Sequence, residues 1–231
     1  MIRETNKENY KIISIGSSCF ISTEMRIIGQ RYESMPFDFI ESNLYFINEV
    51  IINPDESFDS VYGRWSRNEN LKIYKEGGGF TQCSLFHYDP TSMEDIEHFK
   101  RAMERFKSAL VDENIKILFM HINTPYFDKY KSDVPKIQIE LLREIKNSLL
   151  LYYPSLKFDI LSINPYVVDT YLHAHEEYIP YKIYHEESNL IIIQPWCTVP
   201  LTIHWGTERD VWNKIWKQIF EKFNIEYIIP T

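Results

Sequence analysis

Four apolar segments rich in β-branched residues constrain the fold most strongly, because each has the length and composition of a buried strand. They are YKIISIG at 10–16, IKILFMHI at 115–122, LKFDILSI at 156–163 and NLIIIQPW at 189–196. Amphipathic helical patterns lie between and after them, at 19–29, 42–52, 92–110, 135–153 and 207–223. Ser92 and Thr207 stand where N-caps are expected, and Pro135 stands at a first helical position.

The alternation of strands and helices predicts an α/β fold with a mostly parallel sheet, because crossover helices join parallel strands. We expect three layers, with helices on both faces of the sheet, in a Rossmann-like or SGNH-hydrolase-like arrangement. Near residues 70–90, three consecutive glycines between apolar residues predict a hairpin insertion. The 231 residues, 44% of them hydrophobic, can bury a substantial core, so we expect a single α/β domain over 1–231.

The composition argues against several classes of partner. A net charge of −8 gives no basic surface for a nucleic acid, and no apolar stretch approaches the ~20 residues of a membrane span. The first residues have no signal-peptide pattern, so we expect a cytoplasmic protein. The three cysteines show no CxxC spacing, and KEGGGF lacks the phosphate-loop pattern. We therefore expect no disulfide framework, no metal and no cofactor, while the oligomeric state is left open.

Cys19 follows the first predicted strand, where a turn of small residues leads into a helix. In parallel sheets, functional groups gather at the edge where strands end and helices begin. A thiol at a helix N-terminus meets unpaired backbone N–H groups, which favour the thiolate and could hold an oxyanion. Cys19 is thus a candidate nucleophile, with Ser17 and Ser18 beside it in the expected substrate-binding turn. The structural alternative is that a small residue simply fills a tight turn.

A nucleophilic thiol needs a base, and three histidines are candidates for a place near that edge. His121 ends a predicted strand, whereas His87 and His204 lie in connecting segments that could fold over the edge. His121 and His204 are also candidates for substrate binding, and each is equally well explained as a histidine paired with a polar group in the core. The remaining histidines, at 98, 173, 175 and 185, are expected at the surface.

Asp38 lies between two aromatic residues in the segment PFDF. A partly buried carboxylate needs a hydrogen-bond donor. Asp38 therefore either caps the helix that follows, which is the structural interpretation, or orients an imidazole or binds substrate.

The segment ISIGSSCFISTEMRIIGQRYESMPFDFI resembles the opening motif of the putative papain-like cysteine peptidase family (domain of unknown function 1796). The matching positions are Gly16, Cys19, Arg26, Gly29, Ser34, Pro36, Phe37 and Asp38. Two later segments, FHYDP and HWGTERDVWNKIW, resemble other parts of that family more loosely. The resemblance implies that Cys19 is the nucleophile and His87 the general base, with Asp38 or Asp89 as the orienting acid.

Three hypotheses about function follow. The first is a cysteine-dependent hydrolase of the peptidase or amidase type, acting on a peptide or small acyl substrate through Cys19 and a histidine base. The second is an SGNH-like esterase or acyltransferase with the same nucleophile and His204 as base. The third is a non-enzymatic binding module of the same fold, in which Cys19 only lines a pocket.

Overall fold

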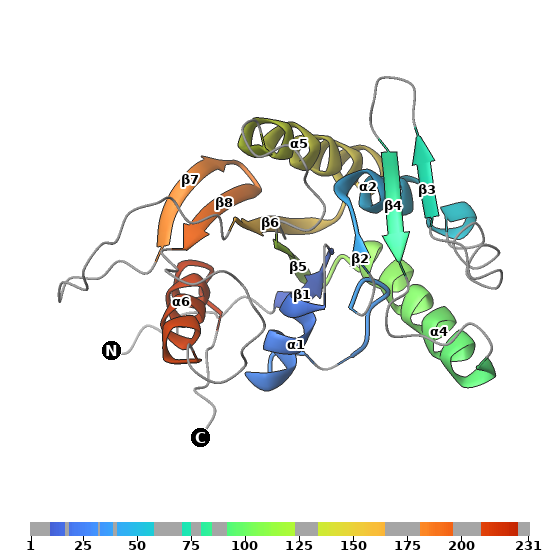
Figure 1. The fold of residues 1–231 in the computed structure, drawn as a ribbon, viewed down its shortest axis with the longest axis horizontal. Coiled ribbons are helices and arrows are strands. Elements are labelled where there is room, and N and C mark those ends of the chain that lie inside the picture. The colour runs from blue at the N-terminus through green and yellow to red at the C-terminus, as the bar shows by residue number, and fades with distance from the viewer. Residues whose placement is uncertain are drawn as a thin grey trace.

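The computed structural model describes residues 10–16, 19–31, 33–38, 41–57, 71–74, 80–84, 92–122, 134–164, 181–195 and 209–225. They include a five-stranded sheet in the order β1-β5-β6-β8-β7 (Figure 1). Its strands are β1 (Tyr10–Ser14), β5 (Lys116–Ile122), β6 (Lys157–Ile163), β7 (Tyr181–Glu187) and β8 (Leu190–Pro195). In this order, β1, β5, β6 and β8 run parallel to one another, and β7 is antiparallel to β8. The four predicted strands and the mostly parallel sheet are confirmed.

Five helices agree with the predicted helical segments to within a few residues. They are α1 (Phe20–Ile27), α2 (Leu44–Ile52), α4 (Met93–Leu110), α5 (Val134–Tyr152) and α6 (Arg209–Lys222). Ser92 is the N-cap of α4, and its hydroxyl accepts a hydrogen bond from the Asp95 N–H at 3.3 Å. Thr207, the cap expected before α6, lies outside the described residues. None of the helices in the described ranges has the length and apolarity needed to cross a bilayer.

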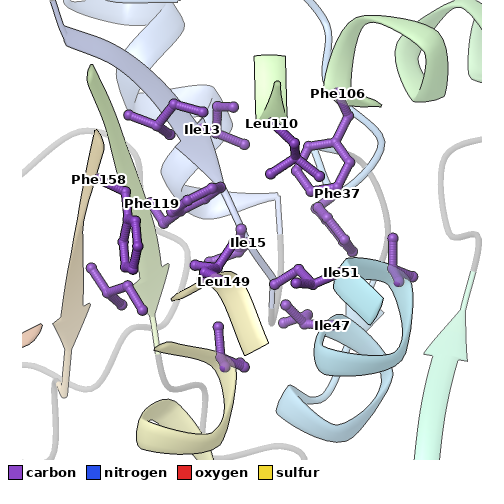
Figure 2. Packing of buried hydrophobic residues seen from close by; sticks show 14 of the residues in the cluster. Ile13, Ile15, Phe37, Ile47, Ile51, Phe106, Leu110, Phe119, Leu149 and Phe158 are labelled. Carbon is purple, nitrogen blue, oxygen red and sulfur yellow. The ribbon is translucent and has the colours of Figure 1, made fainter. Parts of the chain in front are cut away.

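The two faces of the sheet belong to two hydrophobic clusters, because successive strand residues point to opposite sides. Ile13, Phe119 and Ile160 lie in one cluster with residues of α2, α4 and α5, and Figure 2 shows part of this packing. Leu118 and Met120 lie in the other cluster, with residues of α1 and α6. Helices therefore pack against both faces, and α1 lies on the face opposite to α5.

A second, three-stranded sheet has the order β2-β4-β3, with antiparallel pairing throughout. Its strands are β2 (Glu41–Ser42), β3 (Leu71–Tyr74) and β4 (Phe80–Ser84). β3 and β4 fall in the region where an insertion is predicted, and the segment that joins them lies outside the described residues. The short strand β2 follows the candidate site in sequence and connects it to this sheet.

The strand β7 was not predicted from the sequence. Its sequence, YKIYHEE, is half polar, and Ile183 and Tyr184 are exposed rather than buried. His185, expected at the surface, lies in this strand with its Nε2 3.2 Å from Glu187 Oε2. Charged side chains are typical of a sheet edge, where they discourage pairing with other chains. Such a strand lacks the continuous apolar pattern by which the four core strands were recognised.

Candidate functional site

The turn between β1 and α1 requires a glycine at position 16. Gly16 has a φ of +83°, in the left-handed region that residues with side chains avoid. A Cβ at this position would collide with Ser42 Oγ and would lie 2.9 Å from Ile47 Cδ1. The strand β2 therefore packs directly against the turn that leads to Cys19.

Cys19 occupies the N-cap position of α1, with a φ of −69° and a ψ of 0°. Its side chain makes no capping hydrogen bond, and the residue is partly exposed. The Thr23 N–H donates to the Cys19 carbonyl at 3.0 Å, which is the first hydrogen bond of the helical turn. No acidic residue lies in this first turn, so no carboxylate there neutralises the positive end of the helix dipole. The nucleophile hypothesis requires this placement of the thiol.

Ser22 connects the start of α1 to the segment 33–38. Its Oγ lies 2.9 Å from the Cys19 carbonyl oxygen and 2.6 Å from the Asp38 carbonyl oxygen. A hydroxyl carries a single hydrogen, so the two carbonyl oxygens share one donor. Ser22 is only 1% exposed, which keeps water from replacing it. The backbone of Asp38 is therefore held beside the backbone of Cys19.

The carboxylate of Asp38 has other partners. It forms an ion pair with Arg31 Nη2 at 2.7 Å and accepts a hydrogen bond from the Met35 N–H at 2.7 Å. Burial raises the pKa of Asp38 to about 6, although Arg31 and the Met35 N–H act in the opposite direction. The following helix, α2, is capped instead by Asn43, whose Oδ1 accepts from the Phe46 N–H at 3.0 Å. The prediction that Asp38 caps this helix is wrong, because its carboxylate turns back toward Arg31.

His121 lies near the end of β5, the neighbour of β1, and so at the same edge of the sheet as Cys19. The register between β1 and β5 continues past β1, because the Ile15 N–H donates to the Met120 carbonyl at 2.9 Å. His121 Nδ1 lies 3.0 Å from Ser162 Oγ, which also accepts from Gln138 Nε2 at 2.9 Å. Burial lowers the pKa of His121 to about 3, so the ring is neutral near pH 7.

The side chain of His121 faces α5 rather than α1. Its partner Ser162 accepts from Gln138 of α5, and strand alternation puts His121 on the same face as Phe119. Met120, the residue before it, faces the cluster that contains α1. His121 is thus paired with Ser162 in the core, on the face opposite to α1.

The segment that carries Cys19 also carries a family likeness. Residues 10–64 match the model of the family described as "Putative papain-like cysteine peptidase (DUF1796)". This match supports the resemblance seen in the opening motif, and it covers β1, α1, β2 and α2. No curated protein and no solved structure matches the chain. Of the candidate residues described above, the DUF1796 match includes Cys19 and Asp38 but not His121.

Several candidate residues lie outside the part of the chain that the structure describes. They are Ser17, Ser18, His87, Asp89 and His204, and their predicted roles stay predictions. Ser17 and Ser18 fall within the DUF1796 match, whereas the other three lie beyond it. In the described ranges, no group of three or more His, Cys, Asp and Glu residues is placed to hold a metal ion.

Two residues of the site were not singled out from the sequence. Ser22 is a polar residue on the buried side of α1, between Ile21 and Met25, and such a hydroxyl on an apolar helix face indicates a specific hydrogen bond. Arg31 gives no comparable signal, because its pairing depends on how the segment 33–38 folds back. Only the folded chain shows that these two residues and Asp38 form one cluster.

Proposed function

We propose that this chain is a cysteine-dependent hydrolase of the peptidase or amidase type, with Cys19 as the nucleophile. The observation that supports this most is the position of Cys19 itself. The residue is partly exposed, precedes the first turn of α1, and follows β1 at the carboxyl edge of a parallel sheet. It also falls within residues 10–64, which match the DUF1796 family, whose description names cysteine peptidases.

In the proposed reaction, the Cys19 thiolate attacks the carbonyl carbon of a peptide or small acyl substrate. The backbone N–H groups of the first turn of α1 stabilise the oxyanion, with Ser17 and Ser18 lining the substrate site. The base takes the thiol proton and returns it to the leaving amine, which departs as a thioester forms. Water then attacks the thioester, releases a carboxylic acid and restores the thiol.

His87 is the proposed base, with Asp89 as the acid that orients it, on the strength of the family resemblance. His121 fits this role poorly for two reasons. Its pKa of about 3 makes it a weak base near pH 7, and its ring faces α5 while Cys19 belongs to α1. Asp38 is also a poor partner for an imidazole, since its carboxylate is occupied by Arg31 and the Met35 N–H.

A second candidate function is an SGNH-like esterase or acyltransferase, with Cys19 as nucleophile and His204 as base. The mostly parallel sheet favours it, because a turn after the first strand presents the nucleophile in such a fold. The same topology supports a three-layer arrangement of the Rossmann or SGNH-hydrolase kind with an insertion near 70–90.

The experiment uses two substrates with the same acyl group, one a p-nitrophenyl ester and the other an anilide. Turnover is measured for the wild type and for Cys19→Ala, His87→Ala and His204→Ala, and the acyl-enzyme is sought by intact-protein mass spectrometry. Cys83→Ala and Cys197→Ala are the matched thiol controls.

The peptidase or amidase proposal expects turnover of the anilide that is lost in Cys19→Ala and His87→Ala but kept in both thiol controls. Ester turnover that depends on His204 instead of His87 would favour the second candidate. If neither substrate gives turnover or an acyl group on Cys19, both enzymatic proposals fail and a binding module is left.

A further inference from the structure

At the start of α1, the buried hydroxyl of Ser22 bridges two backbone carbonyls. Ser22 Oγ lies within hydrogen-bond distance of the carbonyl oxygens of Cys19 and Asp38, at 2.9 Å and 2.6 Å. The Cys19 carbonyl is also the acceptor for the Thr23 N–H. Any shift of the Asp38 backbone is therefore transmitted through one hydroxyl to the residue that carries the candidate nucleophile.

The segment 33–38 is itself held by two arginines from different elements. Arg31, just after α1, pairs with the Asp38 carboxylate at 2.7 Å, and the side chains of this pair are 11% and 3% exposed. Arg105 of α4 donates from its Nε to the Ser34 carbonyl at 2.9 Å. The Met35 N–H also donates to the Asp38 carboxylate, at 2.7 Å. Asp38 is thus the point where this segment is tied both to the end of α1 and, through Ser22, to its beginning.

The charge of Asp38 is not explained by stability. The fold disfavours the ionised carboxylate relative to water, since burial outweighs the help from Arg31, the Met35 N–H and Arg105 and raises the pKa of Asp38 to about 6. Neutral side chains of similar size in place of the whole Arg31–Asp38 pair would meet the same packing requirement at similar or lower cost. Costly buried charges of this kind occur most often where a function needs them.

We propose that Asp38 and Arg31 are positioning residues for Cys19, which act through Ser22 to hold the first turn of α1 in the geometry that activates the thiol. This inference rests on the proposed function, in which Cys19 is the nucleophile. It assigns Asp38 a role through the backbone, distinct from the orientation of an imidazole.

Protonation of Asp38 weakens the pair with Arg31, so Cys19 reactivity carries a second pH dependence besides the ionisation of the thiol. Among the described residues, the charged groups that act on Asp38 are Arg31 and Arg105. His98 of α4 lies in the field of both arginines, and burial and these charges lower its pKa. It is therefore the group whose titration must be separated from that of Asp38.

The test measures the rate constant for iodoacetamide alkylation of Cys19 by peptide mass spectrometry from pH 5 to 9. A lone thiol gives a logarithmic slope of about 1 below its pKa. The wild type is expected to show a steeper slope near pH 6, which disappears in Asp38→Asn and in Ser22→Ala. At pH 7 both variants are expected to react about tenfold more slowly, the equivalent of about one pKa unit in the thiol.

Two variants serve as controls in this test. Glu33→Gln removes an exposed carboxylate of the segment 33–38, which pairs with Lys11 of β1. His98→Gln removes the titration that competes with that of Asp38. Both are expected to keep the steep slope near pH 6. If Asp38→Asn does not fold, Ser22→Ala decides the question, because it changes no charge.

A second measurement is hydrogen exchange of the Thr23 amide, which is expected to lose protection in Asp38→Asn and Ser22→Ala. Unchanged protection together with unchanged alkylation would overturn the proposal. Faster alkylation of Asp38→Asn would also overturn it, because loss of a nearby negative charge alone favours the thiolate. If the wild type forms no acyl-enzyme while these variants still alter Cys19 alkylation and Thr23 exchange, the proposed function fails and the positioning role stands.

Discussion

The stability of Asp38→Asn relative to the wild type is expected to be higher at neutral pH than at acid pH. The variant keeps the size of the side chain and an oxygen that can accept from the Met35 N–H. It removes the buried negative charge and with it the ion pair to Arg31. Because burial dominates the environment of Asp38, the folded state holds the proton of this carboxyl more tightly than the unfolded chain does.

The size of the effect follows from the two pKa values of Asp38, about 6 when folded and 3.8 as the ordinary value. Each pKa unit corresponds to about 1.4 kcal/mol, so ionisation of Asp38 costs the fold about 3 kcal/mol at pH 7. The cost is small at pH 3.5, where most of the group is protonated in both states, and it is nearly complete at pH 7. The free energy of unfolding of Asp38→Asn minus that of the wild type is therefore expected to rise by about 3 kcal/mol over this range.

The assay is urea unfolding of both proteins between pH 3.5 and about 7, followed by tryptophan fluorescence, since Trp216 is fully buried. Comparing the two proteins at each pH cancels other titrating groups, including His121, whose effect has the opposite sign in an overlapping range. A difference that stays constant with pH would refute the reasoning. A difference that falls as the pH rises would show that the attraction of Arg31 outweighs burial.

Two further predictions concern the same edge of the sheet. His121 is expected to make the wild type less stable as the pH falls below 6.5, because the unfolded chain binds a proton there while the folded chain resists protonation down to about pH 3. His121→Gln should show a weaker loss in urea unfolding between pH 6.5 and 4, and an unchanged pH dependence would contradict the burial of the ring. Gly16→Ala is expected to lower the free energy of unfolding by about 2 kcal/mol or more, because of its positive φ and the collision with Ser42. Thermal unfolding checks this, and a variant as stable as the wild type would show that the turn can relax.

The sequence predicted the framework of the fold because buried parallel strands and amphipathic helices leave strong local patterns. The strands β1, β5, β6 and β8 each carry the continuous apolar run expected of a strand covered on both faces. The edge strand β7 was missed, since a half-polar segment with exposed Ile183 and Tyr184 has no such pattern. Local pattern thus identifies the apolar strands, including the edge strand β1, better than a half-polar edge strand such as β7.

The contacts of the site could be predicted only in part, because they join residues that are far apart in the sequence. The position of Cys19 at a helix start follows from local spacing. The partner of His121 does not, since Ser162 comes from the next strand and is itself held by Gln138 of the intervening helix. A cap on the next helix was one of two interpretations of Asp38, but Asn43 lies directly before that helix and takes this role, while Asp38 pairs with Arg31.

The central claim is that the first turn of α1 activates the thiol of Cys19. The most direct measurement is the pH dependence of alkylation at each of the three cysteines in the native wild-type protein, with iodoacetamide and peptide mass spectrometry. The account predicts that Cys19 reacts with a midpoint well below the ~8.5 of an ordinary thiol, and faster at pH 7 than Cys83 or Cys197. A Cys19 that is inert, or that reacts with the midpoint of an ordinary thiol, would contradict it.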